Sequence, residues 1–410
     1  MSMKSDADFI MQEALKAVLP DQAVARALEK KQFGSGKIVL VSIGKAGWQM
    51  AKTAVDILGS KLSKGIVVTK YEHSKGDLSG VEIWEAGHPV PDDNSFKATA
   101  RAIELVKDLT AEDTVVFLIS GGGSALFEKP LIPEKELQQL THDLLASGAD
   151  IVEMNTIRKR VSAVKGGKFA KLCAPAKVYA VVLSDIIGDP LDMIASGPAY
   201  PDSSTAAEAE AIVAKYNLKL SAQAQALLKE ETPKSLDNVT TIITGSVREL
   251  CKAGAAAAQE KGYKPIVLTD SLTCEAKDAG SFLGSIAAYY SKGTETVAFL
   301  AGGETIVKLI GKGKGGRNQE MAIAAAKKIA GLENVAVFSF GSDGTDGPTD
   351  AAGGYVDGTT EKILAEKGIK IDAVLADNNA YEALKASGGL LITGATGTNV
   401  NDLSMVLIKK

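Results

Sequence analysis

The chain has 410 residues, 45% of them apolar and 23% charged, which is ordinary globular composition and excludes a disordered chain or a coiled coil. Its 46 lysines and arginines against 50 aspartates and glutamates give a formal net charge of −4, so no basic excess favours nucleic acid as a partner. Three cysteines and three histidines support neither a disulfide framework nor a zinc site. Neither a secretion signal nor an apolar run of the roughly 18 residues that span a membrane is present. A reduced, cytoplasmic protein without a membrane partner is expected.

Residues 6–30 carry apolar side chains at helical spacing and predict a helical opening segment. From residue 37, short apolar runs alternate with alanine-rich amphipathic stretches. The runs predict strands, and the first of them is followed by a predicted helix at 47–58. The predicted strands lie at 37–44, 65–70, 114–123 and 177–185. Near-continuous apolar runs are typical of a parallel sheet covered on both faces, so the pattern indicates an α/β protein.

A second series follows the polar stretch 229–239. It comprises predicted strands at 240–245, 264–270, 296–303, 335–344 and 403–410, with helices at 247–262 and 318–330. The length of the chain fits two or three compact domains. We therefore predict a domain boundary near residue 237, which gives domains 1–237 and 238–410.

Glycine-rich clusters follow most of these strands, and ligands of open α/β sheets bind where strands lead into helices. The clusters are 44–47, 120–124, 184–190 with 196–198, 302–304, 315–320 and 342–347. Their N–H groups suit phosphate or carboxylate, although a single cluster such as 44–47 or 120–124 is more often a tight βα turn than a ligand site. None has the Walker A spacing, and Gly44-Lys45-Ala46-Gly47 lacks the middle glycine of the dinucleotide motif.

Two cations stand at such places. Lys45 follows a predicted buried strand at a helix entrance, where it is either a solvated turn residue or a phosphate clamp. Arg317 follows a Gly/Lys-rich loop, where it either forms a loop salt bridge or stabilises a transferred phosphoryl group.

Four aspartates also have two readings each. Asp185 and Asp189 flank the turn after the strand at 177–185, and Asp343 and Asp346 follow the strand at 335–344. Aspartate in such turns caps helices, or it ligates Mg²⁺ or acts as a general base.

Residues 155–168 concentrate five cations in an acidic protein. Lys159 and Lys168 are predicted to lie on a solvated helix face. Arg158 and Lys165 are seven residues apart, and if the stretch is helical they lie on one face and clamp an anion together.

Nine ordered motifs together resemble the glycerate 2-kinase family, the class II glycerate kinases with a C-terminal MOFRL domain. They are IGKAG (43–47), GHPVPD (87–92), SGGGSAL (120–126), NTIRKRVSAVKGG (155–167), LSDIIGDPLDMIASGP (183–198), GGE (302–304), GRNQE (316–320), SDGTDGPTDAAGG (342–354) and TGATGTNVNDL (393–403). They cover both halves of the chain. Arg160 and Ala395 depart from the family pattern, where histidine and proline are frequent.

The resemblance implies an ATP- and Mg²⁺-dependent kinase that converts D-glycerate to 2-phosphoglycerate. It also implies a larger Rossmann-like N-terminal domain with a parallel sheet, a smaller α/β C-terminal domain, and an active site in the cleft between them. Glycerate and nucleotide are the expected partners, and assembly into a homo-oligomer stays open.

The candidate site residues fall into four groups. The catalytic candidates are Lys45, Asp185 and Arg317. Nucleotide binding is assigned to Gly44, Lys45, Gly47, Ser120, Gly121, Gly122, Gly123 and Ser124. Substrate binding is assigned to Asn155, Arg158, Lys165, Asp189 and Asn318, and metal binding to Asp189, Asp343 and Asp346.

Two rival functions remain. A nicotinamide-dependent hydroxypyruvate reductase is a name often given to relatives, but the broken dinucleotide spacing at 44–47 argues against it. A binding module that senses sugar phosphates would bind ligand without turnover, and its strand-end carboxylates would be idle.

Overall fold

The computed structural model describes residues 2–410 as a mixed α/β protein that divides into two compact units. The N-terminal unit comprises residues 23–183 and 189–244, and the C-terminal unit comprises 2–22, 184–188 and 245–410. This division differs from domains 1–237 and 238–410, because the opening helix and the segment 184–188 both belong to the C-terminal unit.

The N-terminal unit is built on a six-stranded sheet of order β3-β2-β1-β4-β5-β6. The pairs formed among β1 to β5 are all parallel. Its elements are α2 (Pro20–Leu28), β1 (Ile38–Ile43), α3 (Gly47–Leu58), the 3₁₀ turn η1 (Gly59–Lys61), β2 (Leu62–Lys70), β3 (Val81–Ala86), α4 (Asp93–Val106), β4 (Thr114–Ile119), α5 (Gly123–Leu126), α6 (Glu134–Ala146), α7 (Ile151–Arg160), α8 (Lys168–Cys173), β5 (Lys177–Leu183), η2 (Ile194–Ser196), α9 (Ala206–Tyr216), α10 (Ala222–Leu228) and β6 (Val239–Gly245).

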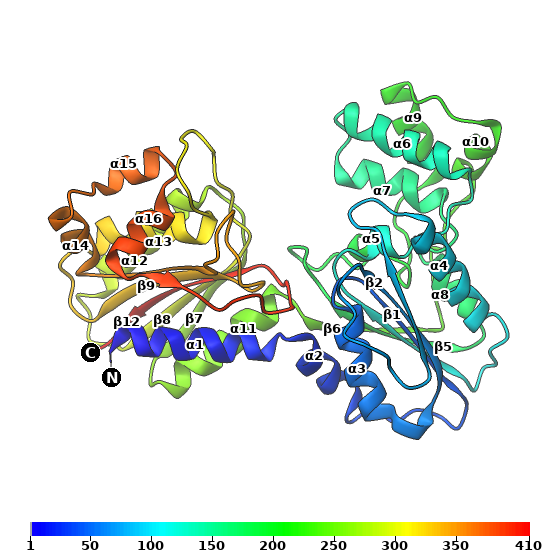
Figure 1. The fold of residues 1–410 in the computed structure, drawn as a ribbon, viewed down its shortest axis with the longest axis horizontal. Helices are drawn as coiled ribbons and strands as arrows, with labels where there is room; N and C mark the ends of the chain where they lie inside the picture. Colours follow the sequence, from blue (N-terminus) through cyan, green and yellow to red (C-terminus); the bar gives the residue numbers. More distant parts are fainter. Residues whose placement is uncertain (1) are drawn as a thin grey trace. The chain divides into compact units, whose positions relative to one another are not determined.

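Alternating residues of β1 enter two different cores. Val39 and Val41 pack with α4 and α8 on one face of the sheet. Leu40 packs with α2 and α3 on the other face. Because side chains of a strand point alternately to opposite faces, helices on both sides explain why every residue of the strand is buried (Figure 1).

Four helices of the N-terminal unit form a separate small core. The helices α6, α7, α9 and α10 group together in Figure 1. Their shared core includes Leu140, Met154, Ile157, Ile212 and Leu228.

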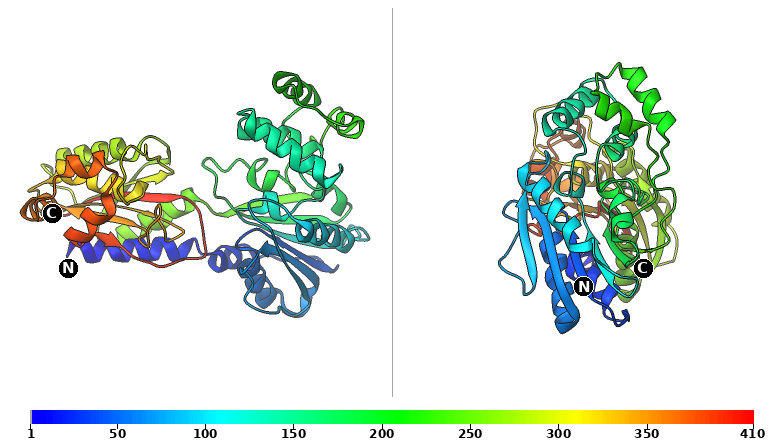
Figure 2. Two further views of the ribbon diagram at one scale, coloured as in Figure 1. Left: turned by 45° about the horizontal axis from the view of Figure 1, so that its top comes forward. Right: turned by 90° about the vertical axis from the view of Figure 1, so that its right-hand side faces the viewer.

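The C-terminal unit holds a second six-stranded sheet, of order β11-β10-β9-β12-β8-β7. Its elements are α1 (Met3–Ala17), α11 (Val247–Glu260), β7 (Lys264–Leu272), α12 (Ala276–Tyr290), β8 (Val297–Gly303), α13 (Arg317–Ile329), β9 (Val335–Gly341), β10 (Gly353–Asp357), α14 (Thr360–Glu366), α15 (Ile371–Ala376), α16 (Ala380–Ser387), β11 (Leu390–Leu391) and β12 (Asp402–Ile408). Leu300 packs toward α1 and α11, and its neighbour Phe299 packs toward α12 and α13. In Figure 1 and the left panel of Figure 2, α1 lies along one face of this sheet.

Strand β12 brings polar residues from two loops of the C-terminal unit close together. It lies between β8 and β9 and runs antiparallel to both. Its first residue, Asp402, therefore pairs with Gly303 at the end of β8 and with Gly341 at the end of β9. The start of β12 thus joins the loops that follow β8 and β9 at one edge of the sheet.

The predicted strands agree with the structure at most positions, with one misplacement. The strand at 240–245 was expected to open the second series, but it is β6, the edge of the first sheet. The polar stretch 229–239 is therefore a connection within the N-terminal unit. Strands β3, β10 and β11 were not predicted, because VEIWEA (81–86) alternates with glutamate and GGYVD (353–357) opens with two glycines.

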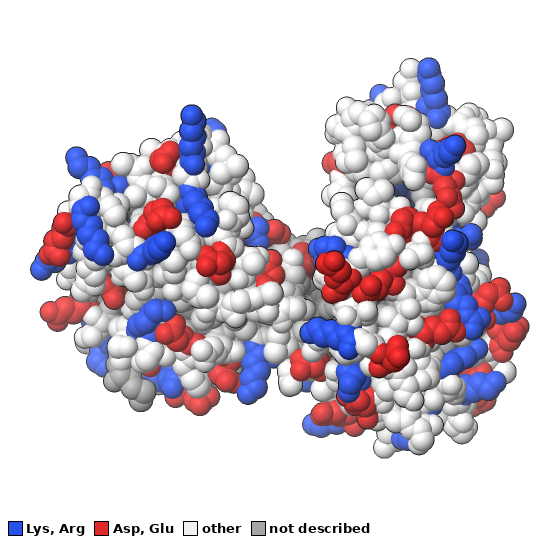
Figure 3. Space-filling model, viewed as in Figure 1, with Lys and Arg blue, Asp and Glu red and all other residues white. Residues whose placement is uncertain are grey.

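No helix among residues 2–410 is both long enough and apolar enough to cross a membrane. Lysine and arginine side chains are interspersed with aspartate and glutamate over the face of each unit that is visible in Figure 3.

Candidate functional site

The two glycine turns of the N-terminal unit lie at the switch point of its sheet. From β1 the chain proceeds to β2 and β3 on one side, and it then returns to place β4 on the other side of β1. The loops after β1 and β4 are 44–47 and 120–124, so both lead away from this point. Open parallel sheets bind ligands at such a position.

The turn after β1 requires glycine at its first position. Gly44 has φ +106°, and a Cβ there would lie 2.3 Å from Ser120 Oγ. Ser120 Oγ donates to the carbonyl of Ile43 at 3.0 Å and accepts the N–H of Ala46 at 3.1 Å. The N–H of Lys45 donates to the carbonyl of Gly121 at 2.9 Å. The two turns are therefore locked to each other by hydrogen bonds.

Lys45 extends from this turn into solvent. Its side chain is exposed, and across residues 2–410 its ammonium has no ion-pair partner. A Cβ at Gly122 would lie 3.0–3.1 Å from ring atoms of His88 and 3.2 Å from Lys45 Cγ, so the histidine and the lysine flank the second turn. His73 Nδ1 lies 2.9 Å from the Lys45 carbonyl oxygen. The turn thus carries, among residues 2–410, an unpaired cation, which attracts an anion, and two imidazoles stand beside it.

His88 was missed in the sequence although it lies in the GHPVPD motif. Burial lowers its pKa, and the charge of Lys45 lowers it further. Because the reference pKa of histidine is near 6.5, the imidazole is neutral at pH 7. The preceding strand, β3, was not predicted, so the signal that would have placed His88 at a strand end was absent.

A buried polar chain supports the second turn. Ser124 Oγ lies 3.0 Å from Ser196 Oγ, and Ser196 Oγ donates to Asn155 Oδ1 at 3.1 Å. Asn155 is almost fully buried and its amide contacts Met193 Sδ. The structure therefore brings Asn155 to the support of the glycine turn, while its predicted contact with substrate stays a prediction.

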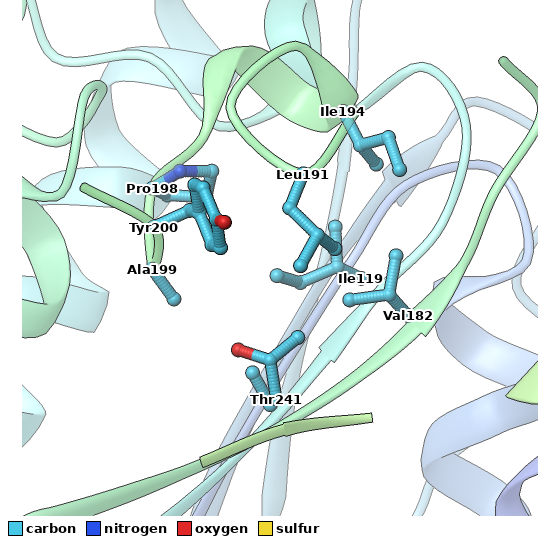
Figure 4. Close-up of a pocket in the computed structure, with 9 residues that line it drawn as sticks. Ile119, Val182, Leu191, Ile194, Pro198, Ala199, Tyr200 and Thr241 are labelled. Carbon is cyan, nitrogen blue, oxygen red and sulfur yellow. The ribbon is translucent and has the colours of Figure 1, made fainter. Parts of the chain in front are cut away.

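The segment around Ser196 is fixed to the sheet by apolar packing. Leu191, Ile194 and Pro198 line a cavity of about 10 Å³ against Ile119 and Val182 (Figure 4). This volume matches about one water molecule, so the cavity is a packing gap and not a ligand site.

Arg158 and Lys165 do not share a helix face. Helix α7 ends at Arg160, so the helical premise of their predicted clamp is wrong. Lys165 is completely buried, and its ammonium donates to the carbonyls of Ser124 and Phe127 at 2.7 and 3.2 Å and pairs with Glu128 at 3.2 Å. Lys165 therefore stabilises the backbone at the end of the glycine turn 120–124 and just after it.

Lys159 and Lys168 are not on a solvated face either, and that expectation is corrected. Lys159 is 2% exposed and pairs with Asp202 at 3.0 Å. Lys168 donates to the carbonyls of Arg160 and Ser162, and burial lowers its pKa to about 8. The basic stretch is therefore an internal network of hydrogen bonds and ion pairs.

In the C-terminal unit, Arg317 is the first residue of α13 and is held by two carboxylates. Its Nε and one terminal nitrogen donate to Asp402 at 2.6 and 3.0 Å, and the other terminal nitrogen donates to Glu304 at 2.9 Å. Burial alone would lower the pKa of Arg317, but its hydrogen bonds and charge interaction with Asp402 outweigh burial and raise it. The guanidinium is therefore a fixed, permanently charged fork.

Asn401 links this arginine pair to the segment 184–188. Its amide donates to Glu304 Oε2 and to the backbone carbonyl of Asp185, both at 3.1 Å. Within the C-terminal unit, Asn401 thus connects the backbone of Asp185 to Glu304, one of the two carboxylates that hold Arg317. Asp189, four residues later, belongs to the N-terminal unit and has φ +53°. Its buried Oδ1 has no hydrogen-bond partner among the described residues 2–410.

Asp346 caps α13 from a distant loop. Gly316 precedes the helix and offers no side chain, and Asp346 instead accepts the N–H groups of Asn318 and Gln319 at 3.2 and 2.9 Å. Asn318 is fully buried and donates its amide to the same carboxylate. The geometry favours the capping reading of Asp346, while the substrate and metal assignments of these two residues remain untested.

This cap predicts a pH-dependent stability. Burial raises the pKa of Asp346 to about 6, and hydrogen bonds from Gln319 and Asn318 oppose the rise. When the pKa of a carboxyl is higher in the folded state than in the unfolded state, the group stabilises the folded protein most below its unfolded pKa, here near 3.8. This contribution to the free energy of unfolding is lost as pH rises through the folded pKa of about 6. Asp346→Asn removes the titration, so the free energy of unfolding of the wild type minus that of the variant should fall by about 2 kcal/mol between pH 4.5 and 7. Urea unfolding followed by circular dichroism measures this difference, and an unchanged difference would contradict the assignment.

Across residues 2–410 no group of three or more His, Cys, Asp or Glu side chains is arranged to hold a metal ion. Among the predicted ligands, Asp343 lies at a pocket described below, and Asp189 has the unpartnered oxygen. Mg²⁺ needs only one or two carboxylates when phosphate oxygens and water complete its shell, so either residue fits such an ion.

The sequence matches known families over most of its length. Residues 6–229 match a domain of unknown function (DUF4147), and residues 297–402 match the MOFRL family. The D-glycerate 2-kinase of Thermotoga maritima is 50% identical over 413 residues, with 99% of each chain covered. The chain belongs to the glycerate 2-kinase family. It is therefore a kinase.

A solved structure and a differently named relative complete the comparison. The crystal structure of the Thermotoga maritima glycerate kinase has a TM-score of 0.95, with 50% identity and 99% of both chains covered. A protein of Agrobacterium vitis named putative hydroxypyruvate reductase is 38% identical over 97% of this chain and 93% of its own. The fold expectation of an α/β protein with a Rossmann-like parallel sheet and a second α/β domain is confirmed; a site between the two stays a prediction.

Proposed function

We propose that this enzyme transfers the γ-phosphoryl group of ATP to the 2-hydroxyl of D-glycerate in a Mg²⁺-dependent reaction. The observation that carries the proposal is Lys45, an exposed and unpaired ammonium on a glycine turn at the switch point of a parallel sheet. Phosphoryl transfer requires little covalent chemistry from the protein and depends on placed cations and N–H donors. Membership of the glycerate 2-kinase family supports the choice of reaction.

The residues of each unit have distinct roles in this proposal. The N–H groups of 44–47 and 120–124 and the Lys45 ammonium bind phosphate oxygens. Arg317, charged and held in orientation by Asp402 and Glu304, stabilises charge on the migrating phosphoryl group.

Magnesium, when bound, neutralises charge on the phosphate oxygens. Asp189 or Asp343 would hold it together with those oxygens. The carboxylate of Asp185 or Asp189 would accept the proton of the substrate hydroxyl.

One pair of assays separates the three candidate functions. A kinase releases ADP only when glycerate and Mg²⁺ are both present. A reductase oxidises NADH with hydroxypyruvate, and a binding module turns over neither pair. We expect the first result, and NMR coupling between ³¹P and the proton on carbon 2 of the product tests the position of transfer.

Asn substitutions test the two aspartates. Asp185 contacts Asn401 through its backbone carbonyl, which Asp185→Asn retains. Asparagine also tolerates the left-handed backbone at position 189, so both variants should fold. We expect turnover to fall at least about tenfold in each, since general-base catalysis contributes at least that much. A raised Mg²⁺ requirement identifies a metal ligand and a shifted pH profile identifies a base, whereas normal kinetics would leave only turn and capping roles.

A further inference from the structure

A pocket of about 650 Å³ lies wholly within the C-terminal unit, beside Arg317. One part of its lining is polar and includes Glu304, Arg317, Asp343 and Asp346. Another part is apolar and includes Ile187, Ile306, Val307, Leu309 and Pro348, and threonines and glycines complete the lining.

The apolar wall is unusually open to water. Leu309 is 80% exposed and Ile306 is 59% exposed. Removing aliphatic surface from water is favourable, so a ligand with an apolar surface would bind more tightly by covering this wall.

A buried polar group in the same lining has no partner. Thr305 is 3% exposed, and its hydroxyl makes no hydrogen bond to any other residue of the described range 2–410. Buried hydroxyls are normally paired, so this one marks a place where a ligand can donate or accept a hydrogen bond.

The charges of the lining favour a nucleoside over glycerate as the ligand of this pocket. Three carboxylates, those of Glu304, Asp343 and Asp346, stand against the single guanidinium of Arg317. Glycerate is a small anion without an apolar face, so it matches neither the charge nor the aliphatic wall. A nucleoside is neutral and carries a flat base whose faces are apolar and whose edge bears hydrogen-bond donors and acceptors.

The wall is held in place by one asparagine. Asn378 Oδ1 accepts the N–H groups of Ile310 and Gly311 at 2.8 and 2.9 Å, and its amide donates to the carbonyl of Lys308 at 3.2 Å and to Glu320 at 3.1 Å. These bonds fix the backbone on both sides of Leu309. The exposed leucine therefore belongs to a built surface.

We propose that this pocket binds the nucleoside part of the phosphate donor, with the base against Ile306 and Leu309 and a hydrogen bond to Thr305. The inference rests on the proposed kinase function and assigns the nucleoside to the C-terminal unit. Glycerate then binds elsewhere.

Three variants of the full-length enzyme test the assignment. Leu309→Ser removes the most exposed part of the wall, and Thr305→Val removes the unpartnered hydroxyl. Ile310→Ser is the matched control, because Ile310 is 62% exposed on the same loop but does not line the pocket. Isothermal titration with ADP and Mg²⁺ gives the dissociation constant, and steady-state kinetics gives KM for ATP and for glycerate separately.

We expect Leu309→Ser and Thr305→Val each to weaken ADP binding about tenfold and to raise KM for ATP about as much, with kcat and KM for glycerate within twofold. Thr305→Val should keep the thermal stability of the wild type, because the hydroxyl makes no internal bond. Ile310→Ser should bind ADP normally. Unchanged ADP binding in the first two variants would overturn the assignment, and so would a rise confined to KM for glycerate.

The outcomes also separate this inference from the proposed function. If the wild type phosphorylates glycerate and the variants bind ADP normally, only the pocket assignment fails. If the wild type does not turn over glycerate but ADP binding depends on Leu309 and Thr305, the pocket assignment holds and the proposed reaction fails.

Discussion

Arg317→Lys should lower kcat at least about a hundredfold while KM for ATP changes much less, because one charge-stabilising donor in a transition state contributes roughly that factor. Lysine keeps the positive charge but loses the planar fork. In the structure the fork makes two hydrogen bonds to Asp402 and one to Glu304, a geometry that one ammonium does not reproduce. A fall confined to kcat is the signature of an interaction made mainly in the transition state.

A control must separate an effect on catalysis from an effect on stability. Asp402 is buried, and in Arg317→Lys it loses at least one of its two hydrogen bonds from the guanidinium. Thermal unfolding of Arg317→Lys measures that cost, and kinetics are compared well below the melting temperature. Arg248→Lys is a suitable comparison, since Arg248 pairs with Asp270 at the surface of the same unit. If Arg317→Lys melts earlier but keeps full kcat, Arg317 is only a structural salt bridge.

The strands near the switch point were predictable because they are buried on both faces. Their runs, such as 38–43 and 114–119, are almost purely apolar, and a parallel sheet between two helical layers requires this. The glycine turns were predictable from the glycines that follow these runs. The structure gives the physical reason for glycine at position 44: its φ is positive, and a Cβ there would lie too close to Ser120. The local sequence was therefore sufficient to predict both the strands and the turns that follow them.

The basic stretch 155–168 was not predictable in the same way. Charged residues at helical spacing are usually solvated, and the partners that bury these ones are distant in sequence. Asp202 is 43 residues from Lys159, and Glu128 is 37 residues before Lys165. Only the tertiary structure shows that Lys165 contacts the glycine turn and that Lys159 is buried in an ion pair.

Distance along the chain is also why the contacts of Asp346 and Asp402 could not be predicted from the sequence. The capping of α13 by Asp346 spans 28 residues, and the pairing of Arg317 with Asp402 spans 85. The latter depends on the insertion of β12 between β8 and β9, a topology that periodicity does not reveal. Sequence reasoning identified Arg317 itself but neither of the carboxylates that orient it.

Lys45→Ala should remove most activity and leave the fold intact. The lysine side chain is exposed and its ammonium pairs with no residue of 2–410, so its removal costs little stability. The N–H bond to Gly121 and the carbonyl contact with His73 are made by the backbone and remain. A lost charge-assisted hydrogen bond to phosphate costs about 1.5–3 kcal/mol, which corresponds to roughly a ten- to two-hundredfold loss in kcat/KM, and the loss is larger if the contact strengthens in the transition state.

Two comparison variants make this test specific to position 45. Lys52→Ala removes an exposed lysine from α3, the helix that the turn enters, and should keep normal kinetics. Lys45→Arg keeps the charge and should retain more activity than Lys45→Ala, because a point charge toward phosphate is partly replaceable by a guanidinium. If Lys45→Ala turns over normally while its melting temperature is unchanged, the turn is only a tight connection after β1. Anion binding would then depend on other donors of the N-terminal unit, such as the backbone N–H groups of 44–47 and 120–124.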